Sequence, residues 1–194
     1  MTPRDALRLA AAALAVGLTP APAPALVTVL SSADVEEALE VGRAGVTQED
    51  FGEEWRIRLP GGEEIVVTTP FSQLAHAARQ AAFRGEVLTD RQRQEQLDRG
   101  KGRILLLVTM YGSRVDFARW YQPTLQVGDR VVKATLAQNE RTALSLEERR
   151  FAARNLYVFP IEGLPPRGAV TLVVQHSVER REVLRARLDL AKMR

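Results

Sequence analysis

The second part of the chain, residues 103–194, is a succession of short apolar or alternating runs separated by turn residues. The run over 103–111 is almost continuously apolar, which predicts a strand buried on both faces. The run over 182–192 alternates apolar and charged residues, which predicts a strand with one buried face. Roughly six or seven such runs follow one another without an amphipathic helix between them. This pattern disfavours a parallel sheet and predicts an antiparallel β-sandwich, of which an immunoglobulin-like arrangement is one form.

The strands expected in this sandwich cover 103–111, 116–122, 124–126, 130–138, 152–161, 169–175 and 182–192. We expect their apolar side chains to form most of one core. The expected core members are Leu105, Leu107, Val132, Leu156, Val158, Leu172, Val174, Leu184 and Leu188.

Residues 26–100 show helix signals around one hairpin. A helix is expected from an N-cap at Ser31 or Ser32 to an end near Gly42–Gly45. The alternating run at 55–59, a Pro-Gly-Gly turn and a returning run at 64–69 predict the hairpin. Thr69 and Pro70 suit an N-cap and a first helical position, and Thr89 opens a capping box before a polar helix. The expected fold is therefore mainly β (α+β), with a short helix–hairpin–helix N-terminal part over 26–100 and a β-sandwich domain over 101–194. The alternative is one compact unit over 26–194.

The first 25 residues have the order of a secretory signal peptide. Arg4 and Arg8 precede an apolar run over 9–18, and alternating Pro and Ala lead to Ala25. That run is too short to span a bilayer as a helix, and no later segment is long enough, so we expect no transmembrane span in the mature chain. Cleavage after Ala21 or Ala23 would leave a proline at the new terminus, which favours a cut after Ala25. We therefore expect a periplasmic or secreted protein, the alternative being a buried N-terminal helix of a cytoplasmic one.

Composition and spacing exclude several kinds of chemistry. The chain has no cysteine, so it has neither a thiol nucleophile nor a cysteine metal site. It contains no Gly-x-Ser-x-Gly elbow, no glycine-rich phosphate loop, no His-x-x-x-His pattern and no EF-hand loop. The two histidines, His76 and His176, are expected to be solvated and partly exposed, respectively. We therefore predict no catalytic, cofactor-binding or metal-binding residues.

The charge of the chain is distributed unevenly. Residues 26–100 carry 8 basic and 14 acidic side chains, whereas residues 101–194 carry 17 basic and 9 acidic ones. Arg181, Arg185 and Arg187 have the same parity on the last expected strand, so they would share one face and could bind an anion or a partner there. The ordinary interpretation is that these arginines keep an exposed sheet face charged and solvated, or form ion pairs with acids of residues 26–100.

An aromatic cluster lies in the second expected strand. Phe117 and Tyr121 would lie on one face of that strand and Trp120 on the other. Exposed Trp120 or Tyr121 could stack on a sugar ring or an aliphatic ligand. The more common role of such residues in a sandwich is in the core, and we favour that role.

Two functional hypotheses remain. The first is an exported, non-enzymatic β-sandwich protein that binds an envelope protein or an anionic envelope component. The second is an envelope-associated hydrolase whose site is an acid pair or is centred on His176. The acid-pair candidates are Glu53, Glu54, Glu63 and Glu64, although Arg56 and Arg58 beside them favour solvated ion pairs. No nucleic-acid motif accompanies the basic residues, and we expect no nucleic-acid partner and no cofactor.

Overall fold

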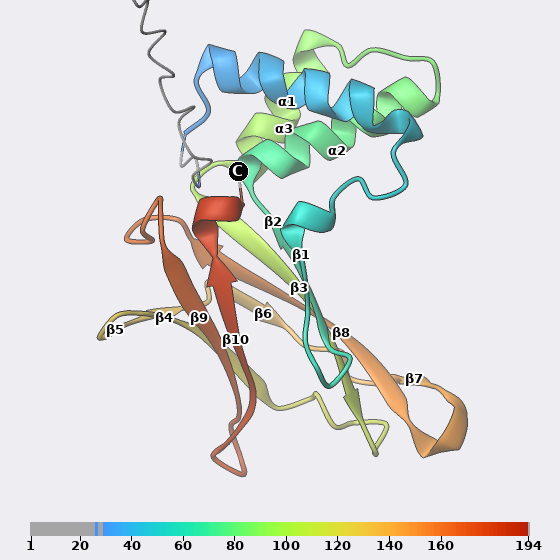
Figure 1. Ribbon diagram of the computed structural model, residues 1–194. Coiled ribbons are helices and arrows are strands. Elements are labelled where there is room, and N and C mark those ends of the chain that lie inside the picture. The colour runs from blue at the N-terminus through green and yellow to red at the C-terminus, as the bar shows by residue number, and fades with distance from the viewer. Residues whose placement is uncertain (1–25, 27–28, 194) are drawn as a thin grey trace, which may run out of the picture.

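A computed structural model describes residue 26 and residues 29–193, with only the backbone of Glu148. The expected signal peptide, residues 1–25, lies outside the described residues. The described chain is mainly β, with two antiparallel sheets and a few helices (Figure 1). Within this described part, every helix is too short or too polar to cross a membrane.

The larger sheet has six strands in the order β1-β2-β3-β8-β6, with β7 also paired to β8. These strands are β1 (Arg56–Arg58), β2 (Glu64–Thr68), β3 (Arg103–Gly112), β6 (Leu136–Gln138), β7 (Leu144–Ser145) and β8 (Phe151–Pro160). The β1–β2 hairpin joins the other strands through the antiparallel pairing of β2 with β3, in which Thr68 lies opposite Leu105. Residues on both sides of position 100 therefore share this sheet.

The smaller sheet has four strands in the order β10-β9-β4-β5. They are β4 (Tyr121–Val127), β5 (Arg130–Lys133), β9 (Ala169–His176) and β10 (Arg181–Asp189). Two hairpins, β4–β5 and β9–β10, are joined by the pairing of β4 with β9. Most of the buried side chains of this sheet belong to the same core cluster as those of the larger sheet.

The longer helices lie together at one end of the sheets (Figure 1). They are α1 (Ser32–Ala44), α2 (Pro70–Phe83) and α3 (Asp90–Gly100), and shorter 3-10 turns are η1 (Gly45–Thr47), η2 (Glu53–Trp55), η3 (Glu147–Arg149) and η4 (Leu190–Lys192). Thr69 and Thr89 accept hydrogen bonds from the N3 backbone as expected, because a threonine hydroxyl satisfies an otherwise unpaired N–H at a helix start. These caps confirm where α2 and α3 begin.

The strand expected over 116–122 is wrong, because residues 115–120 form turns and β4 begins only at Tyr121. Gly112 permits the reversal, since a Cβ at this position would lie 2.4 Å from the ring of Phe117. The ring can fold back over the end of β3 only because that side chain is missing. The last expected strand also ends early, at Asp189, and η4 follows it.

The expected core is partly wrong in the larger sheet. On β3 the buried side chains are Ile104, Leu106, Val108 and Met110, whereas Leu105 is half-buried and Leu107 is 37% exposed. A continuous apolar run does not show which parity faces the core, and this strand buries only one face fully. Leu156 and Val132 are also only half-buried. The remaining expected core members, Val158, Leu172, Val174, Leu184 and Leu188, are buried.

Candidate functional site

A cleft of about 420 Å³ opens where the end of β3, the 113–120 turns, the start of β4 and the β9–β10 turn meet. We call this feature the cleft. It brings together both Trp120 and Tyr121, the aromatic candidates, with Arg181 and His176. It does not contain the other two arginine candidates, Arg185 and Arg187.

Strand register places three of these side chains beside one another. His176 of β9 lies opposite Tyr121 of β4 on one side and opposite Arg181 of β10 on the other. Directly opposed residues of antiparallel strands project from the same face of the sheet, so the three side chains form a row across β4, β9 and β10. The rings of Tyr121 and His176 meet edge to face with centroids 5.9 Å apart.

A β-bulge overturns the expectation that the three arginines share one face. The pairing of β10 with β9 shifts between Glu182 and Leu184, so one extra residue lies in β10 at this point. An extra residue reverses the alternation of the strand. Arg181 consequently shares the face of His176, whereas Arg185 and Arg187 lie opposite Val173 and Thr171 on the other face.

Arg185 and Arg187 lie on the solvent side of β10. Arg185 forms an ion pair of 2.7 Å with Glu182 and donates to the side-chain oxygen of Gln126 at 3.0 Å. Among the described residues, the ion pairs of Arg181, Arg185 and Arg187 include no acid from residues 26–100. The expected pairing of this row with the acidic first part is therefore not found there.

Trp120 and Tyr121 occupy different depths of the cleft. The side chain of Trp120 is 49% exposed, and its carbonyl accepts a hydrogen bond from the N–H of Ser177 at 2.9 Å. This bond ties the tryptophan to the β9–β10 turn. Tyr121 is only 6% exposed and packs against Phe117, which agrees with the core role expected for this cluster, whereas the exposure of Trp120 does not. Trp120 is the more exposed ring of the pair, with the guanidinium of Arg119 5.1 Å from its ring centroid.

A partly buried polar chain holds the start of β4 in place. The hydroxyl of Tyr157 donates to the side-chain oxygen of Asn139 at 3.1 Å, and the amide of Asn139 donates to the carbonyl of Tyr121 at 2.8 Å. Burial raises the pKa of Tyr157, so its hydroxyl stays protonated and keeps its role as donor. The position of Tyr121 is therefore set from the larger sheet.

Two ion pairs lie among the charged side chains of the cleft. Arg114 and Asp116 form an ion pair of 3.1 Å, and Arg181 and Glu179 form one of 2.6 Å. In both cases the hydrogen bond from the arginine is the main reason that the pKa of the carboxyl is lowered. Both carboxylates therefore stay ionised near neutral pH and do not provide the proton of a general acid.

His176 is held by the turn that follows it. Its Nδ1 accepts the backbone N–H of Glu179 at 3.1 Å, and its side chain is 12% exposed. Because Nδ1 is an acceptor, the neutral ring carries its proton on Nε2, which lies 3.9 Å from the Glu179 carboxylate. The strand-end position agrees with the expectation of a partly exposed histidine.

Two of the acid-pair candidates, Glu53 and Glu64, form the expected solvated ion pairs at the hairpin. Arg56 and Arg58 each contact both Glu53 and Glu64, at distances from 2.6 to 3.7 Å. The pKa of Glu53 is lowered, chiefly by the hydrogen bond from Arg58. Over residues 26 and 29–193, no cluster of three or more histidine, aspartate or glutamate side chains is arranged to hold a metal ion.

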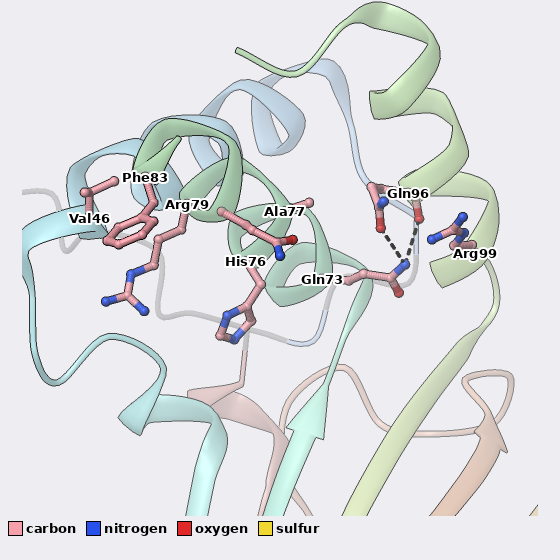
Figure 2. A pocket seen from close by; sticks show the side chains of 9 residues that line it. Val46, Gln73, His76, Ala77, Arg79, Phe83, Gln96 and Arg99 are labelled. Atoms are coloured by element: carbon pink, nitrogen blue, oxygen red, sulfur yellow. Dashed lines mark hydrogen bonds between the residues drawn. The ribbon is translucent and has the colours of Figure 1, made fainter. Parts of the chain in front are cut away.

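A second hollow, of about 610 Å³, lies in the helical layer (Figure 2). We call it the helical groove. Its residues come from η1, α2 and α3, and no motif in the sequence pointed to it. They are Val46, Gln73, His76, Ala77, Arg79, Gln80, Phe83, Gln96 and Arg99.

His76 in the helical groove is exposed, as expected, but it is not surrounded by water alone. Its ring meets Phe51 at 5.1 Å and Trp55 at 5.3 Å between centroids. Partial burial is the main cause that lowers its pKa, followed by the charge of Arg79, while Glu54 acts in the opposite direction. The imidazole is therefore neutral at neutral pH.

Comparison with known proteins gives no family. No family model and no curated protein matches the chain. A crystal structure described as that of a novel protein of unknown function from Burkholderia pseudomallei is similar over 84% of this chain and 92% of its own. The two are 11% identical, with a TM-score of 0.41. A likeness of this size assigns no activity, so the function must be inferred from the geometry of the chain itself.

Proposed function

We propose that this protein is an exported, non-enzymatic β-sandwich protein that binds a saccharide of the cell envelope in the cleft. The observation that carries the proposal is the half-exposed ring of Trp120 at a cleft whose arginines are already paired with carboxylates. An exposed aromatic face packs well against the C–H face of a sugar ring, because both surfaces are flat and apolar.

The paired charges suit the hydroxyl groups of such a ligand. Arg114 with Asp116 and Arg181 with Glu179 offer donors and acceptors side by side, with little net charge. A sugar hydroxyl both donates and accepts, so neighbouring hydroxyls can bond to an arginine and to its carboxylate together. An anionic ligand would have to compete with the carboxylates for the same guanidinium groups, which favours an uncharged saccharide.

Export is proposed from residues 1–25, with cleavage after Ala25. Leu26 is 2% exposed, and its N–H donates to the carbonyl of Pro166 at 2.8 Å. The ammonium group of a chain that begins at Leu26 can donate the same hydrogen bond, so the cut is compatible with the packing of this residue. Sequencing the N-terminus of the protein from its native host tests this point, and an intact Met1 would contradict it.

The finer fold is part of the same proposal. We take the two sheets to pack as a β-sandwich, because inward side chains such as Leu106 of β3 and Leu172 of β9 belong to one core cluster. The four-stranded sheet joins two hairpins through their inner strands, as the four-stranded sheet of an immunoglobulin constant-type domain also does. This likeness supports the immunoglobulin-like form.

Tryptophan fluorescence provides a direct test of saccharide binding. The chain has two tryptophans, and Trp55 is 2% exposed, so quenching by acrylamide should report mainly on Trp120. Neutral oligosaccharides prepared from the host envelope should protect Trp120 from the quencher, and Trp120→Ala should weaken binding by roughly tenfold in calorimetry. Phe83→Ala, which removes another exposed aromatic ring, is the matched control and should bind normally. Equal loss in both variants, or no protection of Trp120, would refute the proposal.

Hydrolysis is the second candidate, because His176, Asp116 and Glu179 line the same cleft. The lowered pKa values of both carboxyls count against it, since neither provides a protonated acid near neutral pH. The measurement is the release of reducing ends from the bound saccharide. Release that disappears in His176→Gln would establish the hydrolase in place of the binding protein.

A further inference from the structure

The helical groove differs from the cleft in the partners of its arginines. Arg79 donates from Nε to the carbonyl of Gly45 at 2.8 Å and from Nη2 to that of Gln48 at 3.0 Å. Its guanidinium also lies 4.7 Å from the ring centroid of Phe51. These contacts immobilise the side chain but leave its charge uncompensated, because carbonyls and an aromatic ring are neutral.

Arg99 adds a second positive charge at the other end of the groove. Figure 2 shows Arg79 and Phe83 on one side, Gln73, Gln96 and Arg99 on the other, and His76 between them. Among the described residues, Arg99 forms no ion pair, and no acidic side chain lines the groove. Glu54 influences His76 electrostatically but is not part of the lining.

The groove also offers the side-chain amides of glutamines and an apolar end. Gln73 donates to the side-chain oxygen of Gln96 at 3.2 Å and to its carbonyl at 3.3 Å, which ties α2 to α3. Gln80 adds a further amide, and each such amide can both donate and accept, as a peptide backbone requires. Phe83 is 78% exposed at the edge, an unusual exposure for a large apolar ring at the end of a helix.

We propose that the helical groove binds an acidic peptide segment of a partner protein. Carboxylates of the peptide would pair with Arg79 and Arg99, its backbone with the glutamine amides, and one apolar side chain with Phe83. Charge complementarity selects this occupant, since the groove is cationic and has amide groups where a peptide backbone needs them. The site is separate from the cleft and does not depend on saccharide binding.

The test uses the full chain and a labelled ten-residue peptide in which glutamates alternate with alanine and phenylalanine. Fluorescence anisotropy should show binding that weakens with added salt and that is lost when glutamine replaces every glutamate. Arg99→Gln should weaken binding about two- to fivefold, as expected for one exposed ion pair. Ala77→Trp should weaken it at least tenfold, because the larger side chain fills the groove.

Arg91→Gln is the matched control for charge. Arg91 lies on the same helix, its side chain is 88% exposed, and it is not part of the groove. The Arg91→Gln variant should bind the peptide as the unchanged protein does. All variants should keep the melting temperature of the parent within a few degrees. Equal loss in Arg91→Gln and Arg99→Gln would overturn the proposal in favour of unspecific charge attraction. Equal binding of the glutamine peptide, or binding of a single-stranded oligonucleotide in place of any peptide, would also overturn it.

Discussion

The cleft and the helical groove hold similar side chains, arginines beside aromatic rings, but partner them differently. In the cleft Arg114 and Arg181 pair with carboxylates, whereas in the groove Arg79 bonds to neutral carbonyls. An arginine paired with a carboxylate still donates directional hydrogen bonds, but its positive charge is largely neutralised at long range. An unpaired arginine attracts negative charge from a distance. The same residue type therefore suits an uncharged saccharide in one place and an acidic peptide in the other.

The two hollows also differ in how the chain builds them. The cleft assembles strand ends and turns far apart in the sequence, as Tyr121, His176 and Arg181 show. The groove is largely the outward face of one helix, where Gln73, Ala77 and Gln80 follow helical spacing. Changes that disturb strand pairing should therefore affect the cleft and spare the groove, and this expectation can be tested.

Gly112→Ala should have the largest effect. The new Cβ would lie 2.4 Å from the Phe117 ring, so the 113–120 turns must move. We expect a loss of about 1–3 kcal/mol in the free energy of unfolding, as for other overpacked sites, and strongly reduced saccharide binding. Denaturant unfolding and calorimetry measure the two effects, and peptide binding in the groove should be unchanged. Normal saccharide affinity in this variant would mean that Phe117 does not shape the cleft.

Tyr157→Phe should have a smaller effect of the same kind. It removes the hydroxyl that donates to Asn139, which in turn holds the carbonyl of Tyr121. A loss of about 1 kcal/mol in stability is expected for one partly buried hydrogen bond, together with weaker saccharide binding. Unchanged stability with unchanged binding would show that the polar chain does not position β4.

His76→Gln should alter the pH dependence of stability more than its value at neutral pH. The pKa of His76 is lowered in the folded state, so the unfolded chain takes up a proton first as the pH falls. The contribution of His76 to the free energy of unfolding is therefore fully present above the ordinary histidine pKa of about 6.5. It is lost as the pH falls through the lowered pKa of the folded state. The melting temperature should drop less between pH 7.5 and 5 in the variant than in the parent. A steeper drop in the variant would contradict the direction of the shift.

The smallest effect is expected for the joint change of Arg185→Gln and Arg187→Gln. Both side chains are exposed on the outer face of β10, away from the cleft and the groove. Stability should change by no more than about half a kcal/mol, and neither ligand should be affected. If the unchanged protein bound an anionic envelope polysaccharide in a salt-dependent way and these changes abolished that binding, the outer face of β10 would be an anion-binding surface after all.

Local signals in the sequence were sufficient for the helix starts and for several strands. Thr69 and Thr89 cap the helices as their residue types indicate, and alternation over Leu184, Ala186 and Leu188 correctly predicts the buried face of β10. The uninterrupted apolar run of β3 has no alternation that shows which side chains face the core. The buried side chains are Ile104, Leu106, Val108 and Met110, not Leu105 and Leu107. A pattern can indicate a face only where polar residues alternate with apolar ones.

The sequence by itself determined the class of most elements, the N-caps at Thr69 and Thr89, the lack of thiol chemistry and the two groups of candidate residues. Tertiary structure alone decided which candidates meet. The bulge between Glu182 and Leu184 separates Arg181 from Arg185 and Arg187, and the ring of Phe117 over Gly112 turns Trp120 out of the expected strand. Both events depend on pairing and packing between residues distant in the chain, and such contacts leave no periodic signal in the segment that they rearrange.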